Sequence, residues 1–192
     1  MAAVFETERL RIRRSQPTDK DVEFLHRLWT TPEVMINVGF PQGLRITRDK
    51  VHRQLTEQPD SEFEVRLLAI RKADGRIIGE CKLGRPDCDG ISEGDVKLMP
   101  EFWRQGFGGE IKKGLVDYTF AHTDAVIIKA TPNQNNIGSQ RMQETVGARR
   151  VGEHVYRFPE HMRSYTCNVP CYVYHLTREE WEKRRRIEAW RH

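Results

Sequence analysis

The strongest structural signal in this chain lies in one segment, Gly94-Asp95-Val96-Lys97-Leu98-Met99-Pro100-Glu101-Phe102-Trp103-Arg104-Gln105-Gly106-Phe107-Gly108-Gly109-Glu110. Its pattern predicts a strand, a break at the proline, a glycine-rich turn and the start of a helix. Apolar residues then recur at helical spacing, at Phe107, Ile111, Leu115 and Tyr118. The first N–H groups of a helix have no partner within it, and the macrodipole adds partial positive charge there. A helix start rich in glycine is therefore typical of a phosphate-binding site.

The composition indicates a soluble globular protein of one domain. A length of 192 residues is enough to bury a core. No apolar run is long enough to span a bilayer. Residues 1–6 show no basic region followed by an apolar one, so we expect no signal peptide. These features predict a cytoplasmic protein that makes no contact with a membrane.

The four cysteines favour free thiols over disulfides, because the expected compartment is reducing. Cys167, Cys171 and His175 have the spacing C-x3-C-x3-H, which invites a metal interpretation. In a strand, however, these three side chains would span too great a length to bind one ion. We therefore expect no metal site.

The formal net charge of +4 is small for a protein that binds polyanions. Residues 177–192 contain six basic and four acidic residues and so supply +2 of it. Arg184-Arg185-Arg186 together with Trp190 could contact nucleic acid. A solvated amphipathic helix explains the same residues, so nucleic acid is not an expected partner.

Periodicity, caps and turn residues predict the remaining elements. Strands are expected at 8–13, 63–70, 77–83, 92–99, 125–131, 149–158 and 169–176. Helices are expected between Thr18 and Pro32, from Thr47 to about Gln58, from 107 to 122, from Ile137 to Gly147, and after Thr177. In the short helix from Ile137, the expected inward residues are Ile137, Met142 and Val146.

The order of these elements predicts an α/β (α+β) fold. The segment 125–131 is almost continuously apolar, so it should be a buried strand parallel to the one at Val96, with the helix as crossover. The Asp74-Gly75 pair predicts a hairpin between two earlier strands. A mixed, mostly antiparallel sheet with a central parallel pair and helices on both faces follows.

Two familiar phosphate-binding loops do not match the glycine-rich turn. A P-loop requires Lys followed by Ser or Thr, but Glu110 and Ile111 follow Gly109. A dinucleotide fingerprint requires glycine at the place of Ile111, and its strand normally comes first rather than after three others.

The segment Trp103 to Glu110 resembles the acetyl-CoA pyrophosphate loop of the GNAT N-acetyltransferases, and most closely that of the RimJ/RimL-like branch. Three other segments are similar to this branch, in the same order: Thr7-Glu8-Arg9-Leu10, Asn136-x-x-Ser139 with Gly147, and Tyr174-x-Leu176-Thr177-x-Glu179-Glu180-Trp181. The resemblance covers almost the whole chain. It implies one GNAT domain over 1–192 with a basic C-terminal helix at about 177–192.

The resemblance also implies how acetyl-CoA would bind. Main-chain N–H groups would hold its pyrophosphate, from Arg104, Gln105, Gly106, Phe107, Gly108 and Gly109. The glycines would permit close approach, and the Phe107 side chain would face the core. The backbone of Leu98 and Met99 would pair with the pantetheine arm, and an N–H near Leu98 would polarise the thioester carbonyl. Asn136 would bond to the arm.

Acetyl transfer to an amine also requires that the amine lose a proton. Glu93 is the first candidate base, acting through water; Asp95 is the second and Glu80 the third. All three could instead be ordinary strand carboxylates. Many GNAT enzymes place a tyrosine near the sulfur, but this chain has Gln143 there, so either Ser139 protonates the thiolate through water or the thiolate leaves unaided. Ser139 could equally bond to its own helix.

The acceptor is expected among the loop 29–44, the strand at Glu80 and the connection 158–168. Apolar walls would come from Met35, Phe40, Met162 and Tyr165, and cations from Arg85, Arg157 and Arg163. The first hypothesis is an N-acetyltransferase that acts by direct attack on acetyl-CoA in a ternary complex, with a primary amine of a small molecule or a protein N-terminus as acceptor. The alternative is a non-catalytic acyl-CoA-binding domain. The last strand and tail helix could pair two chains as a homodimer.

Overall fold

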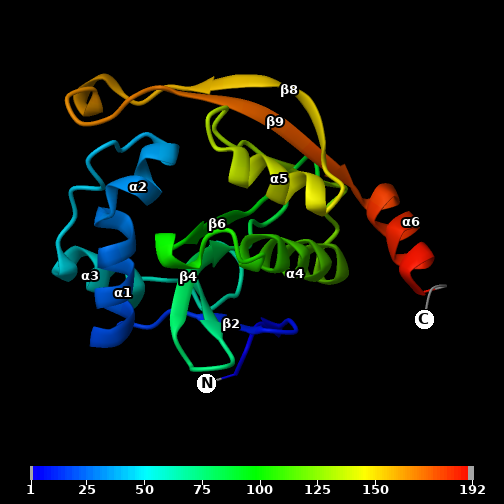
Figure 1. The fold of residues 1–192 in the computed structure, drawn as a ribbon, viewed down its shortest axis with the longest axis horizontal. Coiled ribbons are helices and arrows are strands. Elements are labelled where there is room, and N and C mark those ends of the chain that lie inside the picture. The colour runs from blue at the N-terminus through cyan, green and yellow to red at the C-terminus, as the bar shows by residue number, and fades with distance from the viewer. Residues whose placement is uncertain (1, 190–192) are drawn as a thin grey trace.

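The structure is a computed structural model that describes residues 2–189 (Figure 1). The strands are β1 (Phe5–Glu6), β2 (Leu10–Arg14), β3 (Leu67–Arg71), β4 (Ile77–Lys82), β5 (Ile91–Glu93), β6 (Asp95–Leu98), β7 (Ile127–Ala130), β8 (Arg149–Tyr156) and β9 (Val169–Thr177). The helices are α1 (Asp19–Thr30), α2 (Pro32–Met35), α3 (Arg48–Thr56), α4 (Phe107–His122), α5 (Ile137–Thr145) and α6 (Arg178–Ala189). Short 3-10 turns are η1 (Ile36–Val38), η2 (Pro100–Phe102) and η3 (Glu160–Met162).

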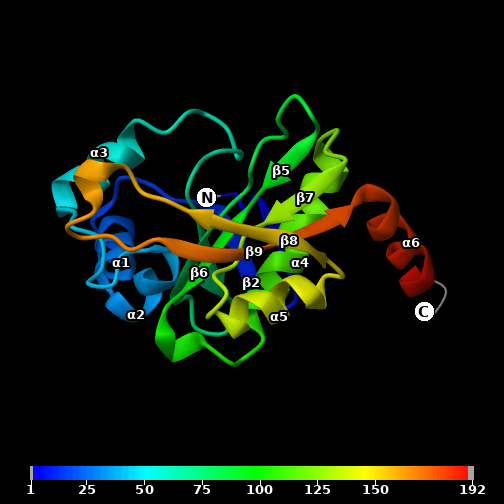
Figure 2. The same cartoon turned by 90° about the horizontal axis from the view of Figure 1, so that it is seen from above.

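The strands form two sheets. One has the order β1-β2-β3-β4-β6, and the other has the order β5-β7-β9-β8. Helices α1 and α3 lie on one side of the five-stranded sheet and α4 lies on the other (Figures 1 and 2). This arrangement confirms the predicted α/β fold with helices on both faces.

The predicted strand 92–99 is wrong as a single element, because the chain divides at Gly94. The residues before it form β5, which pairs in parallel with β7, and those after it form β6, which pairs antiparallel with β4. The parallel partner of β7 is therefore β5 and not the segment around Val96. An added Cβ at Gly94 would lie 2.9 Å from the Lys82 carbonyl oxygen, so the division occurs where a side chain would not fit. The division leaves β6 at the end of its sheet.

Helix caps are expected at Thr18, Thr47 and Thr177. Those at Thr47, whose hydroxyl accepts from the Lys50 N–H at 3.3 Å, and Thr177 form as expected, and the one at Thr18 forms only in part. The Thr18 hydroxyl accepts from the Asp21 N–H at 3.4 Å and begins α1. The Asp21 carboxylate does not complete a capping box; it accepts instead from Arg13 and from the Gln16 N–H. At α6 the box is complete, since Thr177 N–H donates to Glu180 and Glu180 N–H donates to Thr177.

Two further expectations are wrong. Residues 63–66 are not a strand, because Glu64 has a φ of 61°, in the left-handed region, and its N–H donates to the Leu83 carbonyl. In α5, Ile137 is 53% exposed, whereas Gln143 is buried. Val146 is buried as expected, because it shares a helix face with Gln143 three residues before it.

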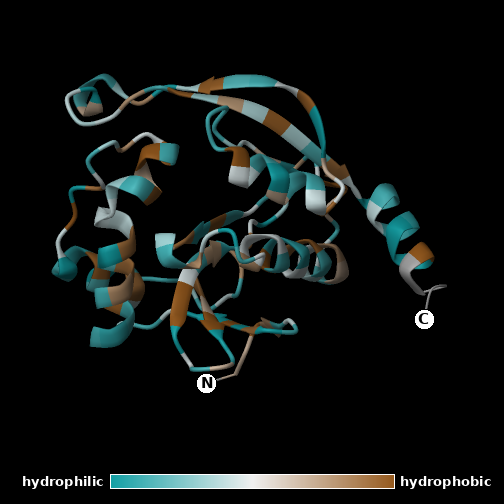
Figure 3. Cartoon of the chain, in the orientation of Figure 1, coloured by the Kyte–Doolittle hydropathy of each residue, from teal (hydrophilic) through white to brown (hydrophobic). Residues whose placement is uncertain are grey.

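The described part of the tail packs on the domain through α6. The Trp181 indole N–H donates to Asp117 on α4 at 2.6 Å, and Arg184 donates to the Thr145 carbonyl at the end of α5. Arg185 and Arg186 are exposed, and Figure 3 shows α6 mostly in hydrophilic colours. Trp190 lies outside the described residues. Over residues 2–189, no helix has both the length and the apolar character that a membrane crossing requires.

Candidate active site

The loop between β6 and α4 presents a row of free main-chain donors. Arg104 has a φ of 60° and Gly106 a φ of 81°, so the backbone turns sharply twice before the helix begins. The first helical bond runs from the Glu110 N–H to the Gly106 carbonyl at 3.1 Å. The N–H groups of residues 104–109 donate to no other residue that the structure describes. This row lies at the positive end of α4 and suits an anion.

Side chains of the loop hold its shape. The Trp103 indole N–H donates to the Leu98 carbonyl at 2.8 Å, and the Gln105 amide donates to the Glu101 carbonyl at 2.8 Å. Phe107 is 4% exposed and packs in the core, as predicted. An added Cβ at Gly108 would meet the Met142 sulfur of α5 at 3.3 Å, so this glycine serves the close packing of α5 against α4.

The edge of β6 offers one further donor. The Met99 N–H donates to the Ile78 carbonyl at 3.0 Å, and the Met99 carbonyl accepts from Phe102. Neighbouring pairs in an antiparallel ladder alternate between bonded and non-bonded, so Leu98, opposite Gly79, directs its N–H away from β4. That direction is toward the outer edge of β6, where the predicted oxyanion contact would lie.

The first two candidate bases lie on either side of Gly94. Glu93 forms an ion pair with Lys129 of β7 at 2.6 Å, and its side chain is 53% exposed. Asp95 pairs with Lys97, two residues along the same strand. Desolvation is the largest influence and would raise the pKa of Asp95, but the charge and hydrogen bond of Lys97, together with the charge of Arg66 and the Val96 N–H, outweigh it, so the pKa of Asp95 is lowered. Asp95 therefore holds a proton less readily than an ordinary aspartate.

Glu80, the third candidate, is fully engaged in the fold. Its carboxylate accepts from the Trp29 indole N–H at 2.5 Å and from Arg66 at 2.8 Å, and the residue is 1% exposed. The guanidinium of Arg66 also lies over the Trp29 ring at 5.2 Å. These contacts indicate a structural role.

Lys112 on α4 is a charged group that sequence reasoning missed. It is 3% exposed, and it makes no hydrogen bond or ion pair with any described residue. Burial lowers the pKa of Lys112 to about 8, although the charges of Asp95 and Glu93 act in the opposite direction. The sequence signal that could have indicated its burial is its place four residues before the buried Val116, on the same face of the helix.

The start of α5 brings two predicted residues together. The Asn136 side-chain oxygen caps the helix by accepting from the Ser139 N–H at 3.0 Å. The Ser139 hydroxyl bonds to no described residue. The side-chain oxygen of Gln143 is buried and also lacks a donor within the described chain.

The predicted acceptor walls meet beneath the tip of the β8–β9 hairpin. The Phe40 ring lies 5.2 Å from that of Phe158 and 6.4 Å from that of Tyr165. The Cys167 N–H donates to the Gly39 carbonyl, which joins the two segments. Figure 1 shows the hairpin tip above α2, and Figure 2 shows that it extends to the side of the molecule where α1 and α3 lie.

The three arginines predicted to supply cations to the acceptor site each have different surroundings. Arg163 pairs with Glu160 in its own turn, at 3.3 Å. Arg85 lies over Phe63, and Arg157 is exposed. Met35 is buried in the core and Met162 is half-buried.

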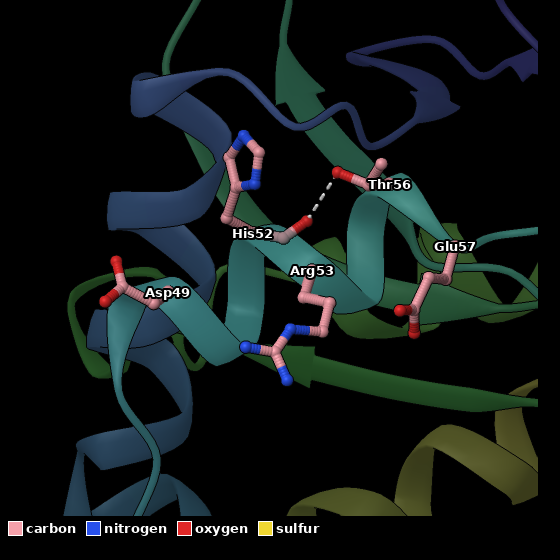
Figure 4. A pocket seen from close by; sticks show the side chains of 5 residues that line it. All are labelled: Asp49, His52, Arg53, Thr56 and Glu57. Atoms are coloured by element: carbon pink, nitrogen blue, oxygen red, sulfur yellow. Dashed lines mark hydrogen bonds between the residues drawn. The ribbon is translucent and has the colours of Figure 1, made fainter.

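A shallow hollow elsewhere, of about 360 Å³, lies on α3 and is lined by Asp49, His52, Arg53, Thr56 and Glu57. These residues are exposed positions along α3 and at its end, and the Thr56 hydroxyl donates to the His52 carbonyl (Figure 4). Helix α3 lies on the opposite side of the five-stranded sheet from α4. The hollow is therefore separate from the donor row.

Comparison with known proteins gives the family. Residues 9–149 match the acetyltransferase (GNAT) domain. An uncharacterized N-acetyltransferase p20 of Bacillus licheniformis is 26% identical over 148 residues, which cover 76% of this chain and 82% of that protein. An acetyltransferase of the GNAT family from Bacillus anthracis is similar in structure, with a TM-score of 0.74, 22% identity, and coverage of 91% of this chain and 98% of that one. The spermidine N-acetyltransferase of Vibrio cholerae, in complex with CoA and spermine, has a TM-score of 0.73 and 18% identity, with coverage of 90% and 98%. Since the matching domain extends over well more than half of the sequence, the protein belongs to the GNAT family and is an acyltransferase enzyme.

Proposed function

We propose that the protein transfers the acetyl group of acetyl-CoA to a primary amine, by direct attack in a ternary complex. The observation that carries this proposal is the row of free N–H groups over 104–109 at the start of α4. These donors and the glycine backbone fit a diphosphate, because they supply hydrogen bonds and positive partial charge without a side chain at Gly106. Family membership makes acetyl-CoA the matching co-substrate.

The chain's own groups suggest roles for each step. The Leu98 N–H, at the edge of β6, would polarise the thioester carbonyl as the amine attacks. The amine would lose its proton through water to Glu93 or Asp95. A C–N bond forms and the C–S bond breaks. The departing thiolate takes a proton from Ser139 through water or leaves unaided, since Gln143 has no acidic proton.

The acceptor is proposed to be an amine of a small molecule or of a protein N-terminus. The spermine in the Vibrio cholerae structure supports the small molecule. The resemblance of the sequence to the RimJ/RimL-like branch, which acetylates the N-termini of ribosomal proteins, supports the protein N-terminus. The aromatic cluster of Phe40, Phe158 and Tyr165 would line its entrance.

The test is thiol release from acetyl-CoA against a panel of amines: peptides with free N-termini, polyamines, aminoglycosides and amino acids. The proposal expects turnover on at least one amine, with mass spectrometry showing the acetylated amine. Glu93→Gln and Asp95→Asn test the base, with Glu57→Gln, at the exposed residue that follows α3, as a matched control. CoA binding without turnover on the whole panel would favour the non-catalytic acyl-CoA-binding domain.

A further inference from the structure

Thr7 and Arg9 lie near the start of the sequence, yet they contact the loop between β6 and α4 and the first turn of α4. The Arg9 Nε donates to the Glu110 carboxylate at 2.6 Å, and the Arg9 N–H donates to its other oxygen at 2.8 Å. The Thr7 hydroxyl donates to the same oxygen at 2.5 Å. Arg9 Nη1 also donates to the Gln105 carbonyl at 3.0 Å. The turn between β1 and β2 thus fastens both the loop and the first turn of α4.

The bond to the Gln105 carbonyl fixes the direction of the next N–H group. In a trans peptide, the carbonyl and the following N–H point in opposite directions. Since Arg9 holds the carbonyl of Gln105, the N–H of Gly106 points away from Arg9. Without this bond, the peptide plane could rotate, because Gly106 has no side chain to restrict it.

Glu110 would otherwise disfavour an anion at this place. Its carboxylate lies in the first turn of α4, beside the row of donors. Burial alone would raise the pKa of Glu110, but the bonds from Thr7 and Arg9 outweigh it and lower the pKa. Arg9 therefore neutralises a negative charge next to the loop, and its guanidinium packs over the Phe107 ring at 4.4 Å.

We propose that Arg9 and Glu110 form a latch that orients the Gln105–Gly106 peptide for a diphosphate. Both are positioning residues, since they act through the loop backbone. This inference rests on the proposed function, in which the diphosphate belongs to acetyl-CoA. It assigns the binding geometry of the loop to a segment about a hundred residues away in the sequence.

The experiment compares CoA with pantetheine, which lacks the diphosphate. Arg9→Ala should weaken CoA binding about tenfold in calorimetry, the worth of about one charge-assisted hydrogen bond, and Glu110→Gln should weaken it less, because it loosens Arg9 but also removes a negative charge beside the loop. Their double variant should be no weaker than Arg9→Ala alone, because the two residues act as one unit. Pantetheine binding, followed by NMR titration, should stay the same. Arg11→Ala is the matched control, two residues further along in β2 and paired with Glu6 rather than with Glu110.

The outcomes separate the latch from a purely stabilising contact. If the contact only stabilised the fold, its loss would lower the melting temperature and leave the ratio of CoA affinity to pantetheine affinity unchanged. That result would overturn the latch. Equal CoA binding by wild type and both single variants, or effects that add in the double variant, would also overturn it. Wild-type protein that fails to bind CoA would contradict the proposed function itself.

Discussion

Replacing Lys112 with methionine should stabilise the protein at neutral pH. The folded pKa of about 8 lies below the ordinary value of 10.5, so the folded state disfavours the charged form. That difference corresponds to about 3 kcal/mol, at about 1.4 kcal/mol per pH unit. Below pH 8 both states are charged and the folded protein bears the whole cost. Between pH 8 and 10.5 the folded protein binds fewer protons than the unfolded chain, so its stability rises with pH.

Urea unfolding of wild type and Lys112→Met at several pH values tests this reasoning. The variant should be more stable by about 3 kcal/mol at pH 7, and the difference should fall to about 1 kcal/mol by pH 10. Comparing the two proteins at each pH removes the contributions of all other titrating groups. Lys50→Met, at an exposed position of α3, is the control and should change stability by less than about 0.5 kcal/mol. A difference that does not vary with pH, or a destabilised variant, would refute the reasoning.

Three other predictions concern stability and reactivity. A thiol reagent should modify the exposed Cys88 and Cys167 in the native protein and all four thiols after unfolding; early reaction of a third would contradict the buried placement. Glu80→Gln should cost about 2 kcal/mol in urea unfolding, because its amide NH2 would face the Trp29 donor; an unchanged midpoint would show that the carboxylate is dispensable. Asn136→Ala should cost about 1 kcal/mol through the lost cap of α5, and Asn136→Ser should restore most of it.

Elements with strong local signals could be predicted from the sequence. Helix α4 ends at His122 as expected, and the caps of α3 and α6 form at Thr47 and Thr177. The division at Gly94 could not be predicted, because the residues on both sides of it have strand character. Only the pairing with different strands, β4 and β7, separates β5 from β6. Pairing of this kind depends on tertiary structure, which local patterns do not encode.

The candidate site, too, has some features with a local sequence signal and others that depend on tertiary structure. The donor row of 104–109 was predictable, because a glycine-rich turn before an apolar helix is a local feature. The contacts of Arg9 with Glu110 join residues far apart in sequence, and nothing in either segment indicates the other. Lys112 reads as an exposed lysine, since its burial depends on the strands that α4 packs against. The carboxylates Glu93 and Asp95 were found by pattern, whereas their lysine partners appear only in the fold.

The most direct test of the central claim is a calorimetric titration of CoA into wild type, Gly106→Ala and Gly75→Ala. Both glycines have positive φ, so each substitution should cost about 1 kcal/mol of stability. An added Cβ at Gly75 meets nothing within 4 Å, whereas one at Gly106, within the donor row, would lie 3.3 Å from Nη2 of Arg9. We predict that wild type and Gly75→Ala bind one CoA with equal affinity, and that Gly106→Ala binds at least about tenfold more weakly. Equal binding by all three proteins, or no binding by wild type, would contradict the account.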